Sequence, residues 1–315
     1  MNLRVVFMGS PEFAVPTLRA LNVNFLVTGV VTQPDKPRGR GQKTLPSAVK
    51  TAGVELELPV VQPTGLASPE ILAALDQWKP DVIVVAAYGR ILPPRILSLP
   101  RMGCVNLHAS LLPRYRGASP ISAAILGGDR VTGVCTILMD HGMDTGDIFL
   151  QTQISILEDD TTGTLHDRLM SEGADLVVET LKGMAGNRVQ AVPQDHNKAT
   201  YTSLLTKEDG RIEWERDAEY LARLVRAMNP WPGAFSEISG ESVKVWETVA
   251  VEGTEKAGYI AGIRPEGVSV GTGKGLLLLR QVQAPGRKRV SAADFACGRR
   301  LRQGEVFNRS KSGAH

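Results

Sequence analysis

Three polar side chains in two short segments are suited to acid–base chemistry. Asn106 and His108 lie two residues apart in the run CVNLH, and Asp144 lies in the glycine-containing segment MDHGMDTGD. Residues two apart on a strand share a face, so Asn106 and His108 are expected to act on one ligand. A histidine exchanges protons near neutral pH, an amide can donate to a developing oxyanion, and a carboxylate can orient the histidine. The set suits acyl transfer to an amine without a covalent intermediate.

Other interpretations of these residues stay open at this point. Asp140 is as well placed in sequence as Asp144 to meet His108. A histidine on a strand is often a packed core residue, and an aspartate in a turn often caps that turn. His108, His141 and Asp144 are metal-ligand types, but their spacing matches no zinc pattern, and no metal is predicted. Ser110 lacks the surrounding GxSxG of a nucleophile elbow.

The elements that would position these residues alternate between strands and helices. Strands are expected at 3–8, 25–32, 82–87 and 104–108, with helices near 13–21, 69–79 and 120–127. Strands that are apolar on both faces indicate a buried, mostly parallel sheet of the Rossmann-like, doubly wound type. Such sheets bind ligands at the carboxyl ends of their strands, where Asn106 and His108 lie. The turn FMGSPEF lacks two glycines of a dinucleotide site, so no NAD is predicted.

The rest of the chain predicts a second, smaller domain. Two more strands, 133–139 and 147–156, precede a long helix at 162–185, and the stretch 187–206 has no period. Beyond it come a helix at about 217–228 and short strands at 243–247, 267–270 and 276–281, which is typical of a small β-barrel. We expect a catalytic domain over 1–188, a linker over 189–206 and an OB-like domain over 207–315.

Composition narrows the class of protein. The chain has 315 residues, 43% hydrophobic and 22% charged, as in globular proteins. Its three cysteines include no CxxC pair, so a disulfide framework is not indicated and a reducing compartment fits best. No apolar run approaches the ~20 residues of a membrane helix, and no signal peptide is recognised. We therefore expect a cytoplasmic protein.

Basic residues concentrate in two places. The net charge is +3, but residues 207–315 hold 18 Lys and Arg against 14 Asp and Glu. A second basic segment, KPRGRGQK at 36–43, contains a proline and glycines that predict an exposed loop without helix or strand. An anionic partner such as a nucleic acid would suit this distribution, and a solvated surface is the alternative.

The segment SLLPRYRGASP, residues 110–120, resembles the SLLPxYRGxxP signature of the 10-formyltetrahydrofolate-dependent formyltransferases. Asn106-Leu107-His108 and Asp144-Thr145-Gly146-Asp147 match that family's N-x-H and D-x-G-D elements in order and distance. The basic loop TQPDKPRGRGQK resembles an insertion in members that act on methionyl-tRNA. The resemblance runs from residue 3 to about 305, and one departure is Ala109, where many relatives have glycine.

This resemblance implies roles for individual residues. Asn106, His108 and Asp144 would be the catalytic trio, and 10-formyltetrahydrofolate would be the formyl donor. The predicted folate-binding residues are Ser110, Leu111, Leu112 and Pro113. The predicted tRNA-binding residues are Arg38, Arg40, Lys43, Arg287, Lys288 and Arg289. The acceptor would be initiator methionyl-tRNA, in the cytoplasm of a bacterial-type cell, with a monomeric enzyme and no protein-bound metal.

Three alternatives share part of this pattern. A formyltransferase acting on a sugar nucleotide would have the first domain and the trio, but not the basic loop and basic second domain. An enzyme formylating glycinamide ribonucleotide would resemble the first domain alone. A non-catalytic RNA-binding protein could keep the scaffold, but the complete trio argues against it.

Overall fold

The computed structural model describes residues 3–38 and 43–308, which divide into two compact units. The first unit takes the chain up to Pro120 together with 131–155 and 166–202. The second takes 121–130, 156–165 and the chain from Ser203 onward. Each unit has its own sheet. Within the described ranges, no helix has the length and apolar character needed to cross a membrane.

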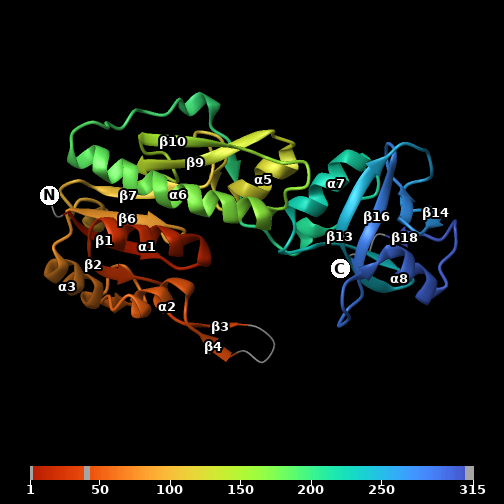
Figure 1. Ribbon diagram of the computed structural model, residues 1–315, viewed down its shortest axis with the longest axis horizontal. Coiled ribbons are helices and arrows are strands. Elements are labelled where there is room, and N and C mark those ends of the chain that lie inside the picture. Colours follow the sequence, from red (N-terminus) through yellow and green to blue (C-terminus); the bar gives the residue numbers. More distant parts are fainter. Residues whose placement is uncertain (1–2, 39–42, 309–315) are drawn as a thin grey trace, which may run out of the picture. The chain divides into compact units, whose positions relative to one another are not determined.

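A seven-stranded sheet forms the centre of the first unit (Figure 1). Its strands, in spatial order, are β10 (Ile148–Ser155), β9 (Val131–Leu138), β7 (Cys104–His108), β6 (Val82–Ala86), β1 (Arg4–Gly9), β2 (Leu26–Val31) and β5 (Val60–Val61). The five strands from β7 to β5 are parallel, whereas β9 is antiparallel to both of its neighbours. The expected mostly parallel, Rossmann-like sheet is confirmed.

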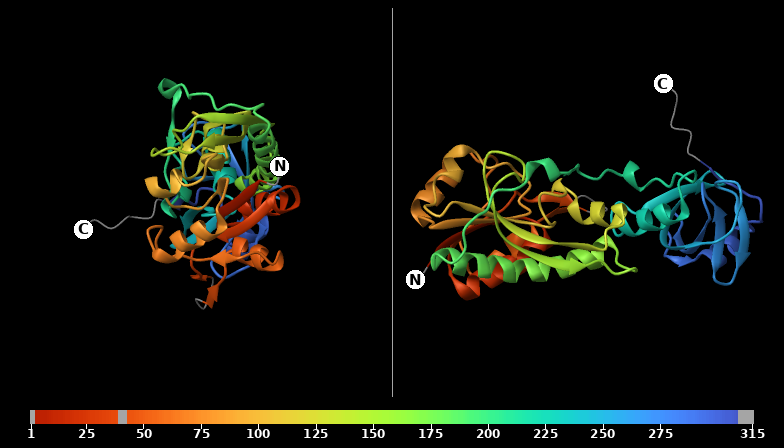
Figure 2. Two further views of the ribbon diagram at one scale, coloured as in Figure 1. Left: turned by 90° about the vertical axis from the view of Figure 1, so that its left-hand side faces the viewer. Right: turned by 90° about the horizontal axis from the view of Figure 1, so that it is seen from above.

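Helices cover both faces of this sheet. They are α1 (Val15–Asn24), α2 (Ala48–Glu55), α3 (Pro69–Trp78), α4 (Pro94–Leu97) and α6 (Thr162–Ala185), with the short helix η1 (Glu12–Ala14) before α1. Figures 1 and 2 show α1 and α6 on one face and α3 on the other. Beneath α3, Ile71 and Leu75 share a buried hydrophobic cluster with Met8 and Val85. Alternate residues of the central strands therefore face different helices, which explains why these strands are apolar throughout.

The basic segment differs from its prediction. Lys36–Arg38 forms β3 and Lys43–Leu45 forms β4, and the two pair as an antiparallel hairpin with Pro37 opposite Thr44. The expectation of a loop without strands was therefore wrong at both ends of the segment. In a two-stranded hairpin each strand is an edge, and an edge position tolerates a proline that has no N–H to donate.

The second unit is built on an antiparallel sheet. Its strands are β12 (Ala234–Ile238), β13 (Glu241–Val251), β14 (Ile260–Arg264), β15 (Gly267–Gly271), β16 (Leu276–Gln283), β17 (Val290–Ser291) and β18 (Phe307–Asn308). The order is β14-β15-β16-β13-β12-β18, and a bridge between Tyr259 and Val306 joins the residues before the two edge strands. The sheet thus closes, as the barrel prediction requires. Its helices are α5 (Pro120–Gly127), α7 (Ala218–Ala227) and α8 (Ala292–Arg299), with η3 at Glu208–Gly210.

The cysteines differ sharply in accessibility. Cys104 and Cys135 are buried, and burial raises the pKa of each thiol to about 12, whereas Cys297 is exposed. A protonated, inaccessible thiol does not react as a nucleophile. We expect Ellman's reagent to titrate one thiol per native chain at pH 8 and three after denaturation. Rapid reaction of all three in the native protein would contradict the packing around β7 and β9.

Candidate active site

Strand β7 presents Asn106 and His108 on the sheet face away from α6. Leu107, between them, packs toward that helix, where a Cβ added at Gly173 would lie 2.7 Å from a Leu107 methyl. Asn106 and His108 therefore point to the other face. His108 is the last residue of β7 and is 6% exposed. The sequence prediction that both side chains share a face at the carboxyl end of a parallel strand agrees with this placement.

The loop that carries Asp144 reaches this face by an indirect route. It leaves β9 at Leu138, opposite Val105, and the Met139 N–H donates to the Cys104 carbonyl at 2.8 Å. Because β9 is antiparallel to β7, the loop starts beside the beginning of β7 and not beside His108. It must therefore lie across the sheet face to bring Asp144 to the two β7 side chains. Asp144 itself has φ of 54°, a left-handed conformation that aspartate tolerates better than most residues.

Asp144 lies between the two polar residues of β7. Its Oδ1 accepts from Asn106 Nδ2 at 3.4 Å, and its Oδ2 lies 3.5 Å from His108 Nδ1. The shortest contact of this carboxylate is to the backbone, since Gly117 N–H donates to Oδ2 at 2.8 Å. The Asp144 side chain is 16% exposed and that of His108 7%. A small, largely desolvated cluster with one edge open to solvent is therefore present.

Both ring nitrogens of His108 face acceptors. Nε2 lies 2.9 Å from the Tyr115 carbonyl oxygen, and Nδ1 faces the Asp144 carboxylate. A neutral imidazole donates from one ring nitrogen only, whereas an imidazolium donates from both. The Nδ1 contact, at 3.5 Å, is longer than a well-formed hydrogen bond. Of the two ring nitrogens, Nδ1 thus has the weaker contact with the protein.

The loop after β7 is held by its own contacts. Ser110 is fully buried, and its hydroxyl donates to the Arg114 carbonyl at 2.6 Å. The Leu112–Pro113 peptide is cis, and Gln151 Nε2 donates to the Leu112 carbonyl at 3.0 Å. Leu112 packs inward on Cys135 and Ile137. Of the four predicted folate-binding residues, Leu111 and Pro113 are the two with partly exposed surface.

Asp140 does not join the trio. Its Oδ1 accepts from the Gly142 N–H at 2.9 Å and from the Thr145 hydroxyl at 2.6 Å, so Asp140 organises the turn before Asp144. His141 is exposed on the same turn. No group of three potential metal-ligating side chains occurs in the described part of the chain.

Glycine at 146 is required by the close return of this loop to β9. A Cβ added there would lie 1.7 Å from the Leu138 carbonyl oxygen. We expect Gly146→Ala to lower the free energy of unfolding by about 1–3 kcal/mol, because the backbone must move to admit the methyl group. Chemical denaturation measures this. Gly65→Ala, where the added Cβ meets nothing within 4 Å, is the matched control and should change it by less than ~0.5 kcal/mol.

Sequence reasoning missed two residues beside the trio, Arg116 and Gln194. Arg116 is 1% exposed although it is charged, and Gln194 contacts both Arg116 and the Asp144 loop. Arg116 lies inside the RYRG motif, so a signal was present, but Gln194 belongs to the stretch interpreted as a linker. Its position beside β8 (Arg116–Gly117) follows from the pairing of that strand with β11 (Tyr201–Thr202), just after the short helix η2 (His196–Lys198).

The predicted tRNA-binding residues lie in both units. Arg38 and Lys43 pair across the β3–β4 hairpin, while Arg40 lies outside the described residues. The hairpin begins beside Asp35, which accepts from Lys50 Nζ and Gln62 Nε2, each at 2.6 Å. The Lys50 bond is the main reason that the pKa of Asp35 lies below its usual value. Hydrogen bonds to Lys50 of α2 and to Gln62 therefore anchor the residue just before the hairpin.

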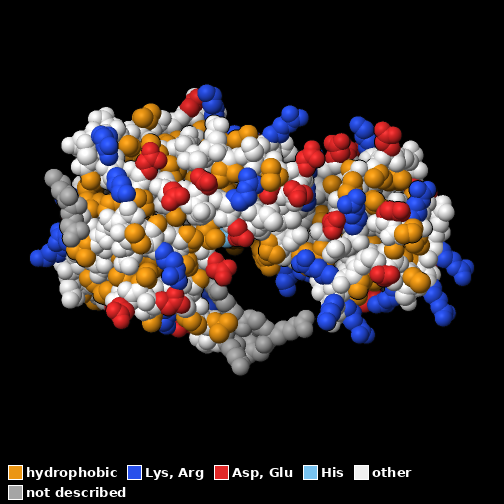
Figure 3. Space-filling model, in the orientation of Figure 1, with side chains coloured by type: hydrophobic (Ala, Val, Ile, Leu, Met, Phe, Trp, Pro, Cys, Tyr) orange, Lys and Arg blue, Asp and Glu red, His pale blue; other side chains and the backbone are white. Residues whose placement is uncertain are grey.

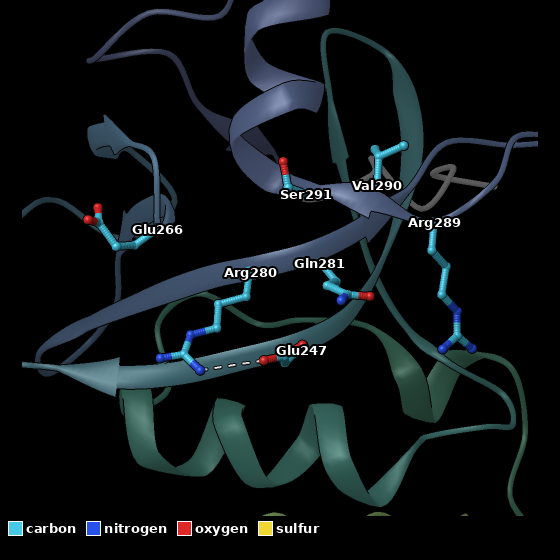
Figure 4. Close-up of a pocket in the computed structure, with 7 residues that line it drawn as sticks. All are labelled: Glu247, Glu266, Arg280, Gln281, Arg289, Val290 and Ser291. Carbon is cyan, nitrogen blue, oxygen red and sulfur yellow. Dashed lines mark hydrogen bonds and ion pairs between the residues drawn. The ribbon is translucent and has the colours of Figure 1, made fainter.

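The basic run of the second unit is exposed. Arg287, Lys288 and Arg289 follow β16, and Figure 3 shows Lys and Arg side chains projecting from this unit's surface. The Arg289 guanidinium lies over the Trp246 ring, 3.7 Å from its centre. A hollow of about 490 Å³ lies here. Figure 4 shows seven residues that line it, with Arg280 facing Glu247. Charges of both signs line this hollow, and it contains no member of the trio.

Both halves of the chain match known protein families. Residues 1–181 match the Formyl transferase family, and residues 204–300 match its C-terminal domain. The methionyl-tRNA formyltransferase of Nitrosospira multiformis is 46% identical over 97% of this chain and 99% of its own length. That of Acetivibrio thermocellus is 42% identical over 97% of this chain and 99% of its own length.

Solved structures share the fold at lower identity. A sugar 3N-formyltransferase, WlaRD, in the presence of dTDP and 5-N-formyl-THF, superposes with a TM-score of 0.66 at 17% identity, covering 91% of this chain and all of that one. HypX from Aquifex aeolicus with tetrahydrofolic acid has a TM-score of 0.63 at 18% identity, covering 94% of this chain and 47% of that one. These likenesses concern the fold alone.

Proposed function

Because the chain belongs to the formyl transferase family, we propose that it transfers the formyl group of 10-formyltetrahydrofolate to the α-amino group of methionyl-initiator-tRNA. The methionyl-tRNA formyltransferases that it resembles match it at 40–46% identity over nearly their whole length, in both units. The product would be N-formylmethionyl-tRNA for translation initiation.

The convergence of Asn106, His108 and Asp144 is the observation that carries this proposal. The neutral amine attacks the formyl carbon, and a tetrahedral intermediate with an oxyanion forms. Asn106 Nδ2–H and the loosely held His108 Nδ1–H donate to this oxyanion, which is the charge that the transition state develops. When the bond from carbon to N10 breaks, the carbonyl reforms and tetrahydrofolate leaves.

Asp144 has two tasks in this scheme. Its negative charge stabilises the imidazolium of His108 electrostatically while Nδ1–H donates to the oxyanion, and it removes a proton from the attacking amine, directly or through one water. The proton ends on the N10 nitrogen of the departing tetrahydrofolate, so the transfer is balanced without any metal or redox partner. Since only the neutral amine attacks, the rate is expected to fall in acid.

A formyl-transfer assay with purified protein and 10-formyltetrahydrofolate tests the proposal. The acceptors are methionyl-initiator-tRNA, methionyl-elongator-tRNA and a 4-amino-sugar nucleotide. Transfer confined to the initiator species is the expected result. The second candidate is a formyltransferase that acts on a sugar nucleotide, since sugar N-formyltransferases share this fold. Transfer to the sugar would support that candidate instead. Absence of transfer to all three acceptors would overturn an enzymatic function of this kind.

The basic hairpin is proposed to contact the tRNA acceptor end. Arg40→Glu should raise the KM for tRNA, leave kcat within about twofold, and reduce the slope of log KM against log salt concentration by about one, as for loss of one phosphate contact. Steady-state kinetics at several salt concentrations measures this. Arg95→Glu, on the exposed surface of α4, is the control. An unchanged KM in Arg40→Glu would assign the charge of the basic segment 36–43 to solubility alone.

The remaining assignments follow from this activity. Residues 207–315, with Arg287, Lys288 and Arg289, would form the tRNA-binding domain, and residues 110–113 would contact the folate. The enzyme would act as a monomer in the cytoplasm of a bacterial-type cell, where initiator tRNA is used. Mass photometry and tRNA binding by the charge-reversal variant Lys288→Glu test the oligomeric state and the basic run separately.

A further inference from the structure

Arg116 is a buried cation with neutral partners. It is 1% exposed, and no ion pair between described residues includes it. Its guanidinium donates to Gln194 Oε1 twice, from Nε at 3.2 Å and Nη2 at 2.7 Å, and to the Tyr201 hydroxyl at 3.3 Å. His196 Nδ1 also lies 2.9 Å from Nη2. Burying a charge without a counter-ion costs free energy, so this arrangement needs a purpose beyond folding.

The Arg116 contacts determine which way the Gln194 amide points. Because Oε1 accepts twice from Arg116, the Nε2 amide group must point away from Arg116. There it donates to two carbonyl oxygens of the catalytic loop, that of Asp144 at 2.9 Å and that of Gly146 at 2.6 Å. Gln194 is 6% exposed, so little solvent competes for these bonds. One buried amide therefore clamps the backbone on which Asp144 is carried.

The same strand supplies the second anchor of Asp144. Gly117, next to Arg116 in β8, donates its N–H to the Asp144 carboxylate. Strand β8 is itself held by β11, through bonds from Arg116 N–H to the Thr200 carbonyl and from Ala118 N–H to the Thr202 carbonyl. The Asp144 side chain is thus bonded to β8 directly, and the Asp144 backbone is connected to β8 through Gln194 and Arg116. A left-handed residue on a long loop needs such support to keep one geometry.

We propose that Arg116 and Gln194 are positioning residues of the reaction. Arg116 fixes the orientation of the Gln194 amide, and that amide holds the Asp144 loop so that Asp144 keeps its distance from His108. This inference rests on the proposed function and adds to it two residues that touch no reacting atom. It also gives the stretch 189–202 a role at the active site in addition to joining two domains. A misplacement of a catalytic group by about 1 Å can cost up to about 10²-fold in rate.

Gln194→Glu is the most informative variant. It keeps the shape of the side chain and the oxygen that accepts from Arg116, but it replaces the donating amide NH2 by an oxygen. That oxygen would face the Asp144 and Gly146 carbonyls, which are acceptors, and would repel them. Gln194→Ala removes both contacts. Gln153→Ala, at an exposed glutamine of β10, is the matched control. Each variant is made in the wild-type chain and in Asp144→Asn.

Two readouts separate positioning from general destabilisation. In the wild-type background we expect Gln194→Glu to lower kcat by about 10- to 100-fold with both KM values within twofold. In the Asp144→Asn background it should lower kcat by less than twofold, because the group being positioned no longer acts. Hydrogen exchange at the Gly117 amide, which Asp144 protects, should accelerate in both Gln194 variants and stay unchanged in Gln153→Ala.

Equal losses of kcat in the two backgrounds, or a Gln194→Ala enzyme within twofold of wild type, would overturn the inference. So would unchanged exchange at Gly117. If the unaltered chain formylates none of the acceptors, the proposed function fails instead. In that event the Gly117 exchange rates still decide whether Gln194 holds the Asp144 loop.

Discussion

Asp144→Asn is expected to lower kcat by about 10²–10⁴-fold, the range that a positioned acid–base group contributes. The asparagine can still accept the Gly117 N–H, so the loop should keep its shape. It carries no negative charge to hold the His108 imidazolium and cannot remove a proton from the amine. The loss should therefore fall on kcat, with the KM values for folate and tRNA little changed.

Single-turnover kinetics with methionyl-initiator-tRNA measures this loss without interference from product release. Asp140→Asn is the matched control in the same loop, because Asp140 bonds to Gly142 and Thr145 and not to His108. It should stay within a few-fold of wild type. If Asp140→Asn were the more damaging change, the assignment of the two aspartates would be reversed.

Asn106→Ala is expected to lower kcat by about 10²–10³-fold, as removal of one oxyanion donor typically does. The Asn106 amide lies on the same face of β7 as His108, and it donates to the Asp144 carboxylate at 3.4 Å. That contact is weak, so the truncation should cost little stability. The KM for tRNA should remain within about twofold, because the amide acts on charge that appears only in the transition state.

Thermal unfolding and circular dichroism would accompany the Asn106→Ala kinetics to exclude misfolding. Asn24→Ala, at an exposed asparagine of α1, is the control. Asn106→Ala with near-full kcat would remove Asn106 from the mechanism and leave His108 as the sole proposed oxyanion donor among the trio.

Local patterns in the sequence predicted the scaffold of the first unit well. Strand 104–108 and helix 162–185 are found with those bounds, because an apolar run and a 3.6-residue period reflect burial directly. Helix α2 was not predicted. It is only eight residues long and contains Gly53, so its period is short, and its start depends on the Ser47 hydroxyl that accepts from Lys50 N–H.

The sequence by itself determined the chemistry available and the shared face of Asn106 and His108, because both depend on residue type and on the two-residue repeat of a strand. The motif resemblance already assigned Asp144, but residue types and spacing alone left Asp140 open, and only the tertiary structure shows why Asp144 meets them. That outcome depends on β9 running antiparallel to β7, so that the loop crosses the sheet face, and on Gln194 fifty residues away holding it there. Strand direction and long-range hydrogen bonds leave no mark on local periodicity, since they arise only when distant segments pack.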